Sequence, residues 1–167
     1  KNNSDLKRKI VAFILVPGDQ AGPNNPEQSG IHNLTHYLNY PKYDAVLNKM
    51  AERGLYNNPD DNVKVIFAPS YLQGNDGVFN LPYYDVLIGM DLTVFPSYYE
   101  PWGYTPMESV AFAVPTITTT LAGFGLWVND YCKENHPGVE VIKRDDYNNQ
   151  EVSNKIANSI LAYTKMT

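Results

Sequence analysis

Two glutamates, Glu100 and Glu108, stand eight residues apart in the aromatic-rich segment PSYYEPWGYTPMES, residues 96–109. A carboxylate in a loop can face a reacting centre. A carboxylate in the first turn of a helix can accept hydrogen bonds from two neighbouring hydroxyls, such as those of a ribose. The prolines stiffen this segment, and Gly103 permits a ligand to approach the main chain closely. The segment 96–109 is therefore the first place to expect a substrate site.

A helix is predicted to begin inside this segment, with Thr105 as its N-cap and Pro106 as its first residue. Free N–H groups from Tyr104 onward, together with the helix dipole, would favour a phosphate without requiring a lysine. The simpler interpretation of Glu108 is structural, because Thr105-x-x-Glu108 matches a capping box. For Glu100 the simpler interpretation is a solvated loop carboxylate. The aromatic cluster has its own simpler interpretation, an edge of the core or a partner surface.

The elements that must position this segment alternate between strands and helices. A continuous apolar run predicts a strand at 10–16, and the regular alternation farther along the chain predicts strands at 63–68, 92–96, 116–120 and 139–142. Apolar residues at helical spacing predict helices at 38–55, 82–90, 106–113, 126–135 and 151–164. This order indicates an α/β domain with a mostly parallel sheet, in which ligands bind at the carboxyl ends of the strands. The stretch from Gly18 to Gly30 is predicted to be a long exposed loop.

Composition restricts the class of protein. The chain has 167 residues, a net charge of −5 and one cysteine. The negative charge argues against a general nucleic-acid or anionic-membrane binder. No apolar run approaches the ~18 residues of a membrane span, and a lone cysteine excludes an internal disulfide framework. We therefore expect one cytoplasmic domain over residues 1–167, with no nucleic-acid or membrane partner.

The histidines suggest no metal centre. His32 and His36 are four residues apart, as in a zinc pair on a helix, but no third ligand with suitable spacing follows. We expect a polar surface role for both. His136 is expected near a helix end, where a basic residue suits the helix dipole.

Three further patterns have open or simple interpretations. Gly123-Phe124-Gly125 is expected to open a helix after a strand, either to approach a sugar or only to form a tight turn. Asp145-Asp146 is most simply the solvated entrance to the last helix. Asn75-Asp76-Gly77 predicts a turn.

The segment 96–109 resembles the signature of the animal and fungal type of glycogen synthase, a family of UDP-glucose-dependent retaining glycosyltransferases with two Rossmann-like domains (the GT-B architecture). The resemblance runs from about residue 63 to residue 142 and extends to Leu81-Pro82-x-Tyr, Pro115–Thr119 and Gly123–Gly125. It implies a Rossmann-like three-layer domain, the C-terminal one of a GT-B enzyme. The loop 18–36 departs from the eukaryotic pattern, and the family's glycine before the strand at 116 is absent, so we expect a bacterial branch.

The resemblance implies a reaction and its two glutamates. The reaction would be glucosyl transfer from UDP-glucose to the 4-hydroxyl of an α-1,4-glucan, with retention at the anomeric carbon and with no obligatory metal or other cofactor. Glu100 would be catalytic and face the glucose and the acceptor. Glu108 would bind the ribose hydroxyls.

The resemblance also implies the other substrate-binding residues. Backbone amides around Gly103, Tyr104 and Thr105, with the Thr105 hydroxyl, would hold the distal phosphate of the nucleotide. The ring of Tyr83 would lie against the uracil.

We further expect a fragment: a nucleotide-sugar domain incomplete at its N-terminal end, without the N-terminal acceptor domain of the same enzyme and inactive alone. Homo-oligomerisation is an open alternative. One rival interpretation keeps the GT-B domain and changes the sugar nucleotide or the acceptor, although such enzymes usually carry EPFG-like text where this chain has EPWGYTP. A second rival is a non-catalytic module that binds nucleotide or glucan and regulates a partner. The intact pair Glu100 and Glu108 argues against this second rival.

Overall fold

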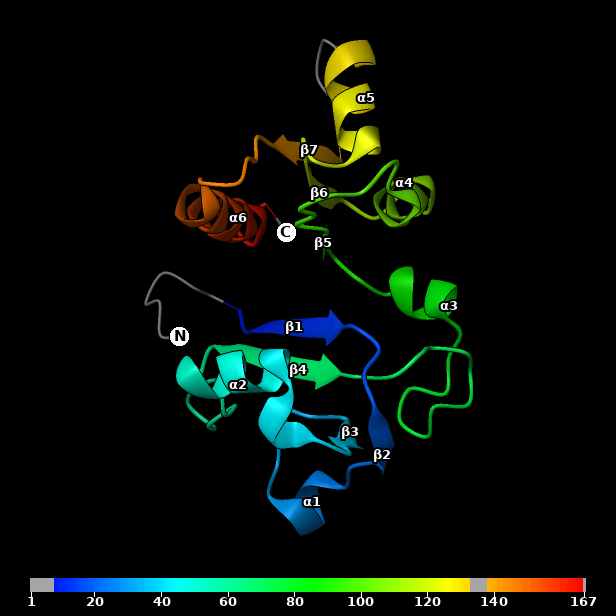
Figure 1. The fold of residues 1–167 in the computed structure, drawn as a ribbon, viewed down its shortest axis with the longest axis vertical. Helices are drawn as coiled ribbons and strands as arrows, with labels where there is room; N and C mark the ends of the chain where they lie inside the picture. Colours follow the sequence, from blue (N-terminus) through cyan, green and yellow to red (C-terminus); the bar gives the residue numbers. More distant parts are fainter. Residues whose placement is uncertain (1–7, 133–137, 167) are drawn as a thin grey trace. The chain divides into compact units, whose positions relative to one another are not determined.

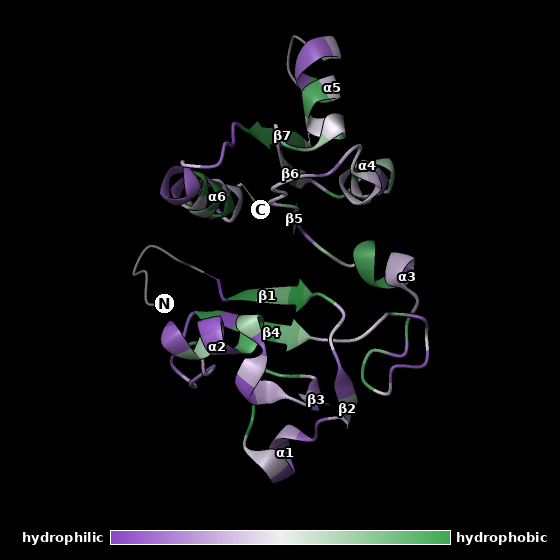
Figure 2. Cartoon of the chain, viewed as in Figure 1, coloured by the Kyte–Doolittle hydropathy of each residue, from purple (hydrophilic) through white to green (hydrophobic). Residues whose placement is uncertain are grey.

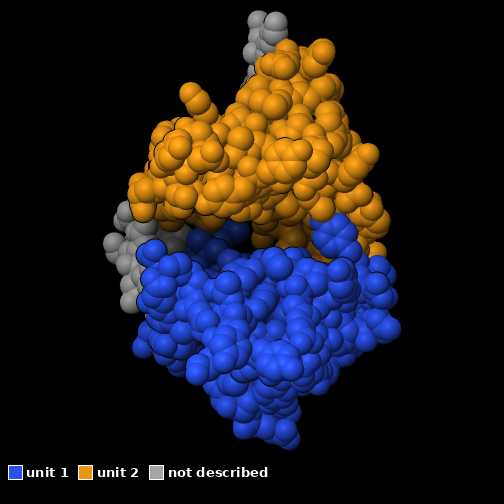
Figure 3. Space-filling view, in the orientation of Figure 1, with its two compact units in different colours: residues 1–83 blue, residues 84–167 orange. Residues whose placement is uncertain are grey.

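The structure, a computed structural model, describes residues 8–132 and 138–166 and divides the chain into two compact units (Figures 1 and 3). Unit 1 comprises residues 1–83 and unit 2 comprises residues 84–167. Each unit contains its own cluster of buried hydrophobic side chains. The expectation for His136 lies outside the described residues. Among the described residues, no helix combines the length and apolar composition that crossing a membrane requires.

Unit 1 is built on two hydrophobic strands that pair in parallel, β1 (Ile10–Leu15) and β4 (Val63–Ala68) (Figure 2). Helix α2 (Ala45–Glu52) contributes Met50 to the same core as Phe67 of β4. These two side chains are 2% and 1% exposed, so the helix and the sheet share one dry interface. Burial of this apolar surface is the main force that holds the unit together.

The helix predicted at 38–55 is shorter in the structure. A 3-10 turn, η1 (Pro41–Tyr43), comes first, and the Asp44 carboxylate then caps α2 by accepting the N–H of Leu47 at 2.7 Å. Pro41 and the Asp44 cap fix this later start, because each favours the beginning of a helix over its interior. The helix also ends before the predicted boundary at 55: its last residue is Glu52, Arg53 is the C-cap, and Gly54 follows with φ +60°.

The prediction that residues 18–30 form one long exposed loop is wrong, because the segment contains regular secondary structure. β2 (Gln20–Pro23) pairs antiparallel with β3 (His36–Leu38), and the short helix α1 (Pro26–Ser29) lies between them in the chain. The polar residues supply local bonds in addition to contacting solvent. Asn25 caps α1, and the buried Asn24 amide donates to the carbonyls of Ile31 and Leu34. Hydrogen bonds from side chains to the backbone, and not a hydrophobic pattern, thus order this segment.

The surface role expected for His36 is also wrong, because its side chain is fully buried in β3, while His32 is exposed. His36 Nε2 donates to the Asp76 carbonyl at 2.7 Å, and Nδ1 lies 2.8 Å from the Thr35 hydroxyl. Since a carbonyl only accepts, Nε2 carries a proton. His36 therefore joins β3 to the turn at residues 75–77.

The turn predicted at 75–77 is confirmed, and its carboxylate organises it. Asp76 accepts the N–H groups of Val78, Phe79 and Asn80, and Gly77 has φ +85°. Burial tends to raise the pKa of Asp76, but the N–H bonds outweigh this effect and hold that pKa below its ordinary value.

Unit 2 is a three-layer structure around the parallel sheet β5-β6-β7, which consists of β5 (Thr93–Val94), β6 (Thr116–Thr119) and β7 (Val139–Ile142). Helix α6 (Asn149–Tyr163) packs Val152 against Ile117 and Ile142 on one face. On the other face, Thr93 binds Ser109 of α4 (Tyr104–Ala111) at 2.7 Å between hydroxyl oxygens. Successive residues of β6 alternate between these two faces.

The predicted α/β class with parallel strands is confirmed. The strands nevertheless form two separate parallel sheets, β1-β4 and β5-β6-β7, where the sequence predicted one mostly parallel sheet. Among the described strands, the short β5 pairs only with β6. Two more helices follow the predicted order: α3 (Tyr83–Leu87), and α5 (Gly123–Tyr131), which ends four residues before the predicted boundary at 135.

Glycines at the start of α5 allow a very close backbone approach. A Cβ at Gly125 would lie 2.2 Å from the Thr119 carbonyl oxygen, and one at Gly123 would lie 2.3 Å from the Pro101 carbonyl oxygen. Both distances are far below any tolerable contact. Of the two interpretations of Gly123-Phe124-Gly125, a tight turn between strand and helix therefore accounts for both glycines.

Gly125→Ala is expected to destabilise the fold by about 2–3 kcal/mol, because α5 must move away from the end of β6. Urea unfolding of the chain measures this loss. Gly89→Ala is the matched control, since its Cβ would meet its nearest neighbour, the Val86 carbonyl oxygen, at 3.4 Å. A Gly125→Ala protein as stable as the Gly89→Ala control would contradict the close approach.

Candidate functional site

The loop that carries Glu100 is fixed by its main chain. Glu100 N–H donates to the Leu121 carbonyl at 3.0 Å, and the Glu100 carbonyl accepts the N–H of Gly123 at 3.1 Å. The Trp102 carbonyl accepts the N–H of Phe124 at 2.6 Å. Two N–H groups at the start of α5 are thereby satisfied by the loop. The exposed Glu100 side chain thus projects from a rigid backbone.

Helix α4 begins two residues earlier than predicted. Its N-cap is Gly103, with φ +97°, and no side chain caps it. A residue with a side chain would be strained at this φ, and its Cβ would meet Pro106 Cγ at 3.2 Å. Thr105 and Pro106 therefore lie inside the first turn, where a proline costs no helical hydrogen bond.

The early start of α4 removes the capping box. Glu108 is the fifth residue of the helix, too far along to return to the N-cap N–H. Its Oε1 instead accepts the hydroxyl proton of Tyr84 of α3 at 2.9 Å. This hydrogen bond and the negative charge of Glu108 raise the pKa of Tyr84 above its ordinary value. This pair could not be predicted from sequence, because the two residues are 24 positions apart.

Five of the predicted site residues lie in unit 2, around the start of α4. A Cβ at Gly103 would lie 3.4 Å from Glu100 Cγ, so the Glu100 side chain starts beside the N-cap of the helix. Tyr104 and Thr105, the first two helical residues, are exposed, and Glu108 follows about one turn later. A loop carboxylate and an uncapped helix N-terminus thus occur together, an arrangement suited to a substrate that carries an anionic group.

Tyr83, the sixth predicted residue, belongs to unit 1 and is half-buried. Its N–H donates to the Leu72 carbonyl at 3.0 Å, and Gln73 forms a bridge with Pro82. This ties Tyr83 to a loop that borders a cavity of about 240 Å³ in unit 1. The cavity follows the ends of β1 and β4 and is lined by Gly18, Gln20, Pro69, Ser70, Tyr71, Gln73, Asn75 and Asp76.

Sequence reasoning missed a basic residue near the loop. Arg144 follows β7 and is 8% exposed, and its guanidinium donates to the Pro96 carbonyl. The only available signal was its place directly after a strand of the sheet, where ligands of α/β proteins bind. Within residues 8–132 and 138–166, no group of three potential metal-ligating side chains comes together.

Comparison with known proteins gives a consistent result. The family model described as glycogen synthase matches residues 28–167. Glycogen (starch) synthase isoform 2 of Saccharomyces cerevisiae is 39% identical over 142 residues, which are 83% of this chain and 19% of that protein. Glycogen (starch) synthase of Neurospora crassa is 35% identical over 133 residues, 79% of this chain and 19% of that protein. The corresponding protein of Caenorhabditis elegans is 41% identical over 102 residues, 60% of this chain and 15% of that protein.

The hydrogen bond between Tyr84 and Glu108 predicts that Tyr84 loses its proton at a higher pH than an ordinary tyrosine. Since the folded-state pKa of Tyr84 lies above the unfolded value of about 10, the contribution of the bond to stability is complete below pH about 10 and is lost as the pH rises through the folded-state pKa. Glu108→Gln should return the pKa of Tyr84 toward its ordinary value. The readout is the NMR titration of ¹³C-labelled tyrosine, with the Tyr84 signal assigned from Tyr84→Phe.

Glu151→Gln is the matched control for this titration, because Glu151 pairs with Lys155 on α6. It should leave the pKa of Tyr84 where it is. A Tyr84 signal that titrates identically with and without Glu108 would show that the bond does not form in solution.

Proposed function

The chain belongs to the glycogen synthase family, and from this premise we propose that it carries the nucleotide-sugar site of an enzyme that transfers glucose from UDP-glucose to a growing α-1,4-glucan. The chain spans 15% to 19% of the length of the three curated relatives named above. The observation that carries the proposal is the pairing of a fixed Glu100 with the uncapped start of α4. This pairing lies within the segment that resembles the family signature.

The difficult step of the proposed reaction is the departure of UDP, which develops negative charge on the diphosphate. The N–H groups around Gly103, Tyr104 and Thr105 and the Thr105 hydroxyl would bind the distal phosphate, and the dipole of α4 would stabilise the developing charge. Pro106 contributes no N–H, so the amides of the N-cap and of the first two helical residues are the principal donors. Donors that are fixed before the reaction stabilise such a charge without a cost of reorganisation.

Glu100 would act on the sugar. Its carboxylate would face the glucose and stabilise positive charge as the bond to UDP lengthens, because retaining transfer proceeds through an oxocarbenium-like state. The backbone bonds of Glu100 to Leu121 and Gly123 support this role, since they limit how far the carboxylate can drift.

Two residues would hold the nucleoside. A carboxylate has about four acceptor positions, so Glu108 can retain Tyr84 and still accept two ribose hydroxyls. The uracil would lie against the ring of Tyr83, whose main-chain N–H is held by the Leu72 carbonyl.

The remaining features of the proposal concern the whole enzyme. We propose that the acceptor glucan and further catalytic groups are bound by a second, N-terminal domain, that this chain alone does not turn over, and that the enzyme is cytoplasmic. The departures from the family pattern at 18–36 and before β6 favour a bacterial branch.

Glu100→Gln in the two-domain enzyme is expected to lower kcat about 10²- to 10³-fold with little change in the KM for UDP-glucose, because the charge acts mainly in the transition state. Transfer of radiolabelled glucose to glycogen measures this. Asp146→Asn, which removes an exposed carboxylate before α6, serves as the control. Full activity of a folded Glu100→Gln enzyme would rule out the catalytic role of Glu100.

Nucleotide binding can be tested in the chain itself. UDP should bind more tightly than ADP in isothermal titration, and Tyr83→Ala should weaken UDP binding about tenfold through the loss of stacking. Tyr147→Ala is the control, since that ring is 96% exposed. Equal binding of UDP and ADP would point to another sugar nucleotide. If neither UDP nor ADP bound at concentrations up to about millimolar, this result would contradict a nucleotide site formed by these residues.

A further inference from the structure

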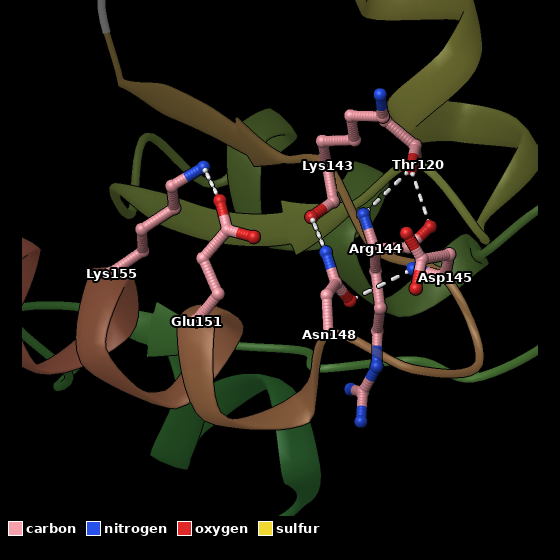
Figure 4. A network of polar contacts seen from close by, with 7 residues as sticks. All are labelled: Thr120, Lys143, Arg144, Asp145, Asn148, Glu151 and Lys155. Carbon is pink, nitrogen blue, oxygen red and sulfur yellow. Dashed lines mark hydrogen bonds and ion pairs between the residues drawn. The ribbon is translucent and has the colours of Figure 1, made fainter.

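Arg144 joins three segments of unit 2 around the loop at residues 96–100. Its main-chain N–H donates to the Thr120 hydroxyl at 3.0 Å, and its guanidinium extends away from Thr120 (Figure 4). Nη1 donates to the Pro96 carbonyl, and Nη2 donates to Asn149 Oδ1 at 3.0 Å. The side chain therefore connects the end of β5 with the start of α6.

The guanidinium also supports Tyr98. Its central carbon lies 3.5 Å from the centroid of the Tyr98 ring, and the Tyr98 hydroxyl donates to Asn149 Oδ1 at 2.5 Å. Asn149 thus accepts from both Arg144 and Tyr98. Two successive parts of the loop, the Pro96 carbonyl and the Tyr98 ring, are held by one rigid planar group.

This position is poor for stability alone. Arg144 is 8% exposed, and its Nε–H finds no hydrogen-bond partner among the residues that the structure describes. Neither of the ion pairs found in the described parts of the chain includes it. A buried cation without an anionic partner is costly, and an apolar side chain of the same size often stabilises a fold more. The contacts of Arg144 go instead to the loop that ends at Glu100.

We propose that Arg144 is a positioning residue for glucosyl transfer. It fixes residues 96–98 through its contacts with the Pro96 carbonyl and the Tyr98 ring, while the first N–H groups of α5 fix Glu100 and Trp102. The Thr119 hydroxyl adds a bond to the Ser97 carbonyl at 2.9 Å. The loop is therefore held along its length, and Arg144 supplies the attachment before Glu100. This inference rests on the proposed function for its catalytic consequence, whereas the ordering of the loop is independent of it.

The first experiment measures the loop in the chain itself. Arg144→Met is expected to speed amide hydrogen exchange at residues 97–103 about tenfold or more, with exchange in α6 unchanged. Lys143→Met is the matched control, because it removes an exposed positive charge from the neighbouring residue. Asn149→Ala, which removes one shared acceptor from an exposed position, should give a smaller effect in the same loop. Exchange in the loop that stays as in the wild type in both variants would overturn the proposal.

The second experiment measures catalysis in the two-domain enzyme. Arg144→Met should lower kcat about 10- to 100-fold, the effect of a displacement of roughly 1 Å at a reacting group, with the KM for UDP-glucose within about threefold. Arg144→Lys should recover little, since a lysine keeps the charge and loses the forked donor. A purely structural role would lower the melting temperature and leave the kcat of folded enzyme unchanged, which would overturn the catalytic part.

The two experiments separate the failure of this inference from the failure of the proposed function. A wild-type enzyme without glucosyl transfer from UDP-glucose would refute the proposed function, and the exchange result would still decide whether Arg144 orders the loop. A strong recovery by Arg144→Lys would show that charge and not positioning matters, and would overturn the proposal.

Discussion

The candidate site depends on one close packing of backbone against backbone. The Pro101 carbonyl oxygen lies 2.3 Å from where a Cβ of Gly123 would be, and the carbonyls of Glu100 and Trp102 accept the first N–H groups of α5. A helix start normally needs a side-chain cap or water for these groups. Here the loop serves as the cap, so the chain positions Glu100 and completes α5 with the same hydrogen bonds.

The polar side chains of the sheet extend this arrangement. β6 is fully buried, yet three of its four residues are threonines. Thr116 bonds the Val114 carbonyl, and Thr119 bonds the Ser97 carbonyl. Hydroxyls on a buried strand allow the sheet to hold irregular backbone at its carboxyl edge, where a purely aliphatic strand would leave those carbonyls unsatisfied. Rigidity at the site thus comes from polar contacts, and stability comes from the apolar layer under α6.

The sequence pattern predicted which segments form helices and strands, whereas local backbone geometry and hydrogen bonds decided where these elements begin. The regular alternation of strand and helix patterns located the five parallel strands, including β6, whose residues are mostly threonines. Single residues misled where more than one conformation satisfies them. Thr105-Pro106 is typical of a helix start, but Gly103 can adopt φ +97° and serves as the N-cap, so the helix begins earlier. His36, Tyr84 and Arg144 could not be assigned, because their partners are distant in the chain and no periodic pattern records such pairs.

The corrected start of α4 changes how Glu108 is interpreted. As a capping-box residue it would need no ligand, and its oxygens would be turned toward the N-cap. At the fifth position Glu108 cannot bond the N-cap N–H, and within the described residues only one of its oxygens has a hydrogen bond, from the exposed Tyr84. A bond between two largely solvated groups contributes little to folding. The bond to Tyr84 therefore orients the Glu108 side chain but gives no strong structural reason for a glutamate at this position. The ribose hydroxyls of a nucleotide would use the acceptor positions that Tyr84 does not occupy.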